Sequence, residues 1–150
     1  MIKENIGQLF VRDLQKLRQE MEAYTDEPAI WKTIDGINNS AGNLCLHLIG
    51  NLNTYVGATL GGTGYIRNRD LEFSLKNTPI INLLEEIDKV IIVIKETFDK
   101  ITDDQLKESY PSDVLGYPMN KLYFLMHLQA HLNYHLGQIN YHRRIVSNLK

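Results

Sequence analysis

Four segments of the sequence place apolar residues every three or four positions, which is the spacing of an amphipathic α-helix. They cover about residues 5–24, 40–61, 78–101 and 119–146, and stretches rich in Gly, Pro, Asn and Asp separate them. No segment shows the alternating pattern of a strand ladder. Helices of this length, each with one apolar stripe, bury their stripes together by packing around a shared axis. The sequence therefore predicts an all-α fold, a four-helix bundle.

Residues that start and stop helices stand at the ends of these segments. Ser40 is a favourable N-cap for the second segment, and the glycine pair 61–62 ends it. Thr78 followed by Pro79 predicts a cap and then a proline at the first helical position. Residues 102–105 favour one short extra turn. The connections after the first and second segments are long for an antiparallel bundle, so we expect crossovers or lids over a site.

Length and charge limit the class of protein. A chain of 150 residues suits a single domain over residues 1–150, and its 43% hydrophobic content supports a core. The net charge of -2 and the scattered basic residues argue against a nucleic-acid partner. The sequence has neither an apolar signal-peptide stretch nor a run of roughly 20 apolar residues, so we expect no membrane partner and a cytoplasmic location. The single cysteine, Cys45, is interpreted as a small core residue.

The histidines are distributed unevenly, because four of the five fall in the last helical segment: His127, His131, His135 and His142. Residues four apart lie one turn above each other on the same helix face, so such a pair directs two imidazoles at one ion. On a helical wheel His131 and His135 lie closer to the apolar stripe than His127 does. His142 also faces inward, but it lies about 10 Å beyond His135 along the axis and is interpreted as a core-edge or outer-shell residue.

A catalytic metal site of the zinc type usually has three protein ligands and one open position. His47 flanks the apolar stripe of the second segment and is the candidate third ligand. The alternative is that all three imidazoles are ordinary buried groups with hydrogen-bond partners. Asn51 and Gln138 stand near the proposed ligands, where they either orient imidazoles or satisfy neighbouring backbone groups.

Other metal and catalytic motifs are missing. No histidine has an acidic residue three positions before it, which excludes the paired Glu-x-x-His motifs of di-iron bundles. Residues 127–131, HLQAH, have the spacing of a zincin helix but lack its glutamate. The sequence also lacks the cysteine spacing of structural zinc sites and a glycine-rich phosphate loop. A mononuclear three-histidine site remains.

Two motifs resemble those of the DinB/YfiT-like superfamily. They are HLNYHLGQI at 131–139, followed by two arginines, and NLCLHLIGN at 43–51. The resemblance implies an up-down-down-up bundle, often a homodimer, with one metal ligand from the second helix and two from the last. Those ligands correspond to His47, His131 and His135. Characterised members include thiol S-transferases that use bacillithiol, mycothiol or glutathione, and thiol-dependent maleylpyruvate isomerases.

The sequence and the resemblance together predict a divalent-metal-dependent enzyme. A thiol S-transferase, with a small-molecule thiol and an electrophile as partners, is the first expectation, and a hydrolase is the related one. The alternative is a non-catalytic helical bundle that the metal braces and that acts as a ligand- or protein-binding module. Zinc or nickel is the expected ion, with iron or manganese next. Residues 65–73 are expected to form a lid or a solvated loop, and Trp31 is expected to line the pocket mouth or to anchor packing.

Overall fold

The computed structural model describes residues 1–148, and helices dominate it. In chain order the elements are α1 (Ile2–Glu22), the 3-10 helix η1 (Glu27–Trp31), α2 (Ala41–Leu52), the π-helix η2 (Asn53–Ala58), α3 (Arg69–Ser74), α4 (Ile80–Lys100), the 3-10 helix η3 (Gln105–Lys107) and α5 (Lys121–Val146). The only strand-like pairings among the described residues are two isolated bridges. The prediction of an all-α fold is confirmed.

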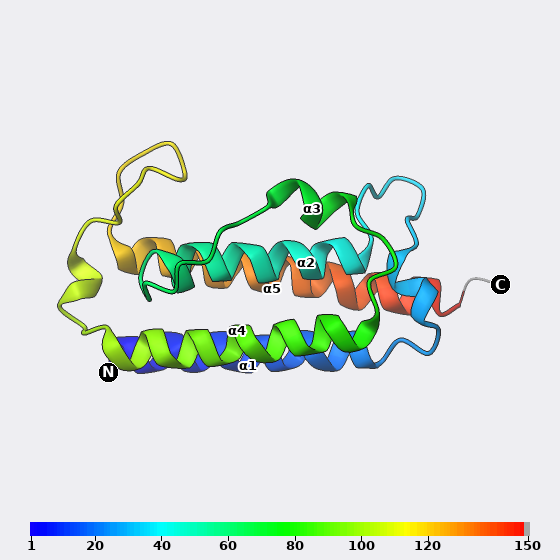
Figure 1. The fold of residues 1–150 in the computed structure, drawn as a ribbon, viewed down its shortest axis with the longest axis horizontal. Coiled ribbons are helices and arrows are strands. Elements are labelled where there is room, and N and C mark those ends of the chain that lie inside the picture. Colours follow the sequence, from blue (N-terminus) through cyan, green and yellow to red (C-terminus); the bar gives the residue numbers. More distant parts are fainter. Residues whose placement is uncertain (149–150) are drawn as a thin grey trace.

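The helix α1 lies beside α4 in the lower part of Figure 1, and α2 lies beside α5 above them. The start of α1 meets the end of α4, where Lys3 Nζ donates to the carbonyl of Phe98 at 3.1 Å. These two helices are therefore antiparallel. Asp13 of α1 accepts from Asn133 of α5 at 2.7 Å, and seven residues further along α1 Glu20 accepts from Arg143 at 2.7 Å. Hence α1 and α5 run in the same direction.

The core is a single cluster to which all four long helices contribute. Its fully buried members include Phe10 of α1, Leu48 of α2, Ile87 of α4 and Leu132 of α5. Trp31 packs against this core from η1, and Gly42 makes room for it, since a Cβ at that position would lie 2.6 Å from the indole ring. Trp31 is thus a packing anchor. None of the described helices combines the length and the apolar surface that a bilayer crossing requires.

Two helix starts differ from the predictions because their caps come from distant residues. The first helix begins at Ile2 rather than near residue 5, and the Asp103 carboxylate accepts from the amide of Lys3 at 2.9 Å and from the terminal amine of Met1 at 2.7 Å. Pro79 is the N-cap residue of α4 and not its first helical residue. There the carboxylate of Glu27, not the Thr78 hydroxyl, accepts from the amide of Ile80, at 2.5 Å.

The second helical segment changes its winding partway along. Ser40 is its N-cap as predicted, and its hydroxyl accepts from the amide of Asn43 at 3.2 Å. After Leu52 the backbone widens into the π-helix η2, which the sequence analysis did not foresee. Its five-residue hydrogen bonds include the amide of Gly61 to the carbonyl of Val56 at 2.9 Å. The π-helix begins six residues after the candidate ligand His47. Such π-turns are frequent near functional sites.

Candidate metal centre

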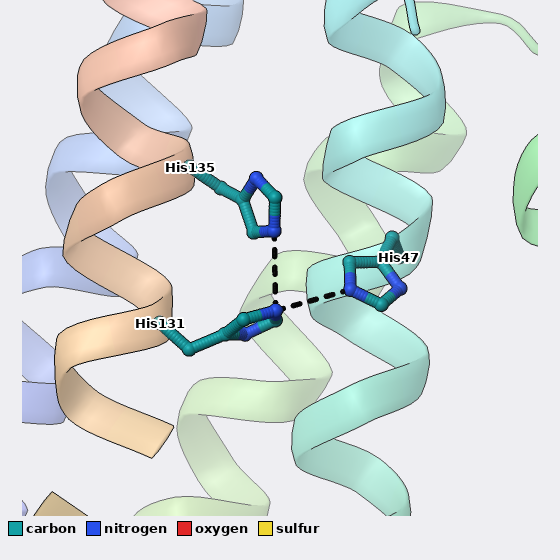
Figure 2. Close-up of side chains that lie close together, drawn as sticks. All are labelled: His47, His131 and His135. Atoms are coloured by element: carbon teal, nitrogen blue, oxygen red, sulfur yellow. Dashed lines mark hydrogen bonds between the residues drawn. The ribbon is translucent and has the colours of Figure 1, made fainter. Parts of the chain in front are cut away.

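Three imidazole rings from two helices meet between α2 and α5 (Figure 2). Nε2 of His131 lies 3.2 Å from Nε2 of His47 and 3.1 Å from Nε2 of His135. One nitrogen from each ring falls within 4.8 Å of the others. The structure therefore brings together the three residues that the sequence analysis selected as candidate ligands.

The helix geometry explains this convergence. His131 and His135 are one turn apart on α5, and their rings stand nearly perpendicular, at 89°. The helix α2 runs antiparallel to α5, since the ring of Tyr55, two turns beyond His47, contacts Phe124, two turns before His131. This register brings His47 level with the pair on α5.

The cluster fits a metal ion better than it fits a hydrogen-bonded triad. Two nitrogens of a tetrahedral site with zinc–nitrogen bonds of roughly 2.0–2.1 Å are about 3.3 Å apart, close to the separations here. Nδ1 of His135 faces an acceptor oxygen at 2.7 Å, and Nδ1 of His47 lies 3.1 Å from Glu72 Oε1 and 3.3 Å from Nη2 of Arg67. Because the carboxylate is the closer group to His47, we place a hydrogen on both Nδ1 atoms and a lone pair on both Nε2 atoms. A proton on His131 Nε2 serves one of these lone pairs well and leaves the other poorly satisfied. A cation can accept a lone pair from all three Nε2 atoms.

Hydrogen bonds at Nδ1 fix the orientation of two of the three rings, those of His47 and His135. Gln138 Oε1 accepts from Nδ1 of His135 at 2.7 Å, so Gln138 does contact a ligand ring. Asn51 makes no hydrogen bond to an imidazole within residues 1–148, and its Oδ1 is buried without a partner there. Nδ1 of His131 is likewise buried without a partner in the described part of the chain. Packing against neighbouring rings therefore orients His131.

The sequence analysis missed Glu72, the outer partner of His47. Residues 65–73 include the start of the short helix α3, which packs on α2, so they are not a freely solvated loop. Glu72 Oε1 lies 3.1 Å from Nδ1 of His47, and the Arg67 guanidinium binds both carboxylate oxygens at 2.8 and 2.9 Å. The sequence signal was Gly50, because a glycine inside a helix often marks a close approach. A Cβ there would lie 1.9 Å from Glu72 Oε2.

Burial holds the site in its metal-binding protonation state. Burial, reinforced by the neighbouring imidazoles, lowers the pKa of His131 to about 4. Burial also lowers the pKa of His47, although the carboxylate of Glu72 opposes this shift. Imidazole binds metal only when neutral, so these lowered pKa values favour the metal-binding form of His131 and His47.

The remaining histidines and the cysteine lie outside the cluster. His142 is buried as a core-edge residue, where its Nε2–H donates to the Lys32 carbonyl at 2.8 Å and its Nδ1 accepts from the Tyr24 hydroxyl at 2.6 Å. It has no contact with the ligand rings among the described residues. His127 is exposed and stacks between Phe124 and His131, with ring centroids 5.9 and 6.4 Å away. Cys45 is buried in the core as expected, and burial raises its thiol pKa to about 12.

We expect the metal-free protein to lose stability as the pH falls from about 6.5 to about 4. The pKa of His131 in the folded chain lies below its ordinary value near 6.5, so between the two values the unfolded chain binds more protons. Protonation then favours unfolding. Urea midpoints of chelator-treated protein at about pH 7.5 and about pH 5 measure this, and His131→Ala should show a smaller fall. An unchanged or higher wild-type midpoint at the lower pH would contradict the expectation.

Comparison with known proteins gives a family and a fold. The family described as "Protein of unknown function (DUF1572)" matches residues 4–150. The chain is similar to the crystal structure of a DinB-like protein from Bacillus cereus ATCC 10987, with a TM-score of 0.74 and 21% identity over 96% of this chain and 92% of that one. No curated protein matches the sequence significantly. The chain thus belongs to the DUF1572 family and has the fold of a DinB-like protein.

Proposed function

We propose that this protein is an enzyme that binds one divalent metal ion through His47, His131 and His135 and transfers a small-molecule thiol to an electrophile. The observation that carries the proposal is the convergence of three Nε2 atoms on a common point, with separations of 3.1 and 3.2 Å along the cluster. Three protein ligands are the number that catalytic sites of this kind use, and they leave a coordination position for a substrate.

The charge of the ligand set suits the activation of a bound thiol. All three ligands are neutral imidazoles, and the nearby Glu72 carboxylate is already paired with Arg67. The full charge of a divalent ion would therefore remain at the open position. When bound, such an ion lowers the pKa of a thiol or of water that reaches it. Activation of water, as in a hydrolase, would use the same residues.

The protein's own side chains hold the rings in place for this chemistry. The carboxylate of Glu72 and the amide oxygen of Gln138 accept hydrogens from the Nδ1 atoms of His47 and His135. Each acceptor fixes the tautomer that leaves Nε2 free to bind. The ring of Phe73 covers His47, with the two centroids 5.1 Å apart, and limits the access of water from that side.

The test is a cobalt-substituted sample, prepared from protein purified without a histidine tag. Adding 2-mercaptoethanol should perturb the visible cobalt spectrum and produce a sulfur-to-metal band, because the thiol reaches the open position. Its methyl thioether, 2-(methylthio)ethanol, is the matched control and should leave the spectrum unchanged. A spectrum that ignores the thiol would overturn the transferase proposal in favour of a bundle braced by its metal.

A further inference from the structure

The short helix α3 is fastened to α2 beside the candidate metal centre. The Asn43 amide of α2 donates to two carbonyls of this segment, those of Glu72 at 2.9 Å and Leu75 at 2.8 Å. The ring of Phe73 lies against His47. The α3 segment therefore docks on the same stretch of α2 that carries a proposed ligand.

Glu72 makes the contact that matters for the ligand. Only 5% of this residue is exposed, and an isolated buried carboxylate would be costly. Its charge is balanced by Arg67, which pairs with both of its oxygens. One of those oxygens also faces Nδ1 of His47 at 3.1 Å, closer than Nη2 of Arg67, which lies 3.3 Å from the same nitrogen and donates to the carboxylate at 2.9 Å. Because a carboxylate only accepts, this closer contact favours the tautomer with hydrogen on Nδ1 and a lone pair on Nε2.

Gly50 shows that this close approach is built into α2. A glycine inside a helix costs about 1 kcal/mol relative to alanine. A side chain there would collide with the carboxylate, since its Cβ would lie 1.9 Å from Glu72 Oε2 and 3.4 Å from Nε of Arg67. The glycine lets the Arg67–Glu72 pair pack directly against the backbone of α2, one turn from His47.

We propose that Glu72 is a positioning residue for the metal site, and that docking of α3 on α2 is coupled to metal binding. This inference rests on the proposed function of the three histidines. The contact between Glu72 and His47 favours the metal-binding tautomer. By reciprocity, an ion on Nε2 stabilises the docking of α3 on α2. The helix α3 is then a clamp that tightens when the ion binds.

The first test compares Glu72→Gln with Asp70→Asn. Both changes remove one negative charge from α3, but Asp70 is exposed and touches no ligand ring. Zinc affinity, measured by competition with a chromophoric chelator, should fall about 10–100-fold in Glu72→Gln and stay within about twofold of wild type in Asp70→Asn. Equal affinities of wild type and Glu72→Gln would overturn the proposal.

Two further measurements exclude a merely structural effect. Nitrogen NMR of the metal-free protein should find the His47 hydrogen on Nδ1 in wild type and a mixture of tautomers in Glu72→Gln. Zinc should slow amide exchange in residues 69–75 of wild type and Asp70→Asn, and much less in Glu72→Gln. Gly50→Ala keeps the glutamate at position 72 but pushes its carboxylate away from α2, so it should match Glu72→Gln in zinc affinity.

The outcomes separate this inference from the proposed function. If wild type binds no zinc through the three histidines, the proposed metal site itself fails. If wild type binds one zinc ion and Glu72→Gln binds it equally well, with the same tautomer at His47 and the same protection of α3, only the positioning role is wrong. Weak zinc binding by Glu72→Gln, with the same His47 tautomer as in wild type, would also count against the positioning role of Glu72.

Discussion

Replacing His131 with alanine is expected to abolish specific metal binding, with an affinity loss of more than about 100-fold. Changes to an outer partner of a ligand already cost about 10–100-fold, and His131 occupies the middle of the cluster, with its Nε2 within 3.2 Å of both other rings. Its loss leaves two nitrogens on different helices. Elemental analysis of tag-free protein and zinc titration measure the effect.

The same variant should lose the stabilisation that metal gives the fold. Free zinc at about 100 times the dissociation constant adds about 2.7 kcal/mol to the stability of a protein that binds it only when folded. Wild type should therefore melt at a higher temperature with zinc than with a chelator, whereas His131→Ala should melt at the same temperature in both.

His127→Ala is the matched control, because His127 is exposed, lies one turn before His131 on the same helix and contacts it only by stacking, with the ring centroids 6.4 Å apart. It should bind one zinc ion per chain and keep the metal-dependent melting shift. If His131→Ala bound zinc with wild-type affinity, the three-histidine site would be wrong. Loss of metal in both variants would mean that His127 is also needed at the site, against the assignment of three ligands.

The ligands could be predicted from the sequence because their geometry is local or follows from the bundle. The spacing of His131 and His135 fixes a shared helix face, and an inward His47 on a neighbouring helix can meet them. Glu72 could not be found in this way. It stands in a long connection with no periodicity, and its docking depends on Arg67 and on the space at Gly50. Only the glycine inside α2 hinted at it.

The same distinction explains the helix ends. Ser40 caps its own helix three residues away, so the cap was visible in the sequence. Asp103 caps α1 from 100 residues further along the chain, and Glu27, 53 residues before α4, accepts from the first amide of that helix. Such caps depend on tertiary packing. They shift an element boundary by a few residues and leave the apolar stripes, and hence the bundle, unchanged.

Replacing Phe10 with alanine is expected to lower the free energy of unfolding by about 3–5 kcal/mol, the usual cost of removing a buried aromatic ring. Phe10 has no exposed surface, and its ring lies 5.9 Å from that of Phe98, between α1 and α4. Its neighbour Leu9 is the control. Leu9 is 37% exposed, and Leu9→Ala should cost less, about 1–2 kcal/mol, since more than a third of its surface already lies in water.

Chemical denaturation of metal-free protein compares the two variants without the contribution of the ion. For a chain of this size each kcal/mol corresponds to about 2–4 °C in melting temperature, so Phe10→Ala should melt about 10 °C lower. Both variants should still bind one zinc ion at low temperature, because neither residue touches the ligand rings. A loss at Leu9 as large as that at Phe10 would contradict the assignment, because it would mean that another surface covers Leu9 in solution, as a second copy of the chain would.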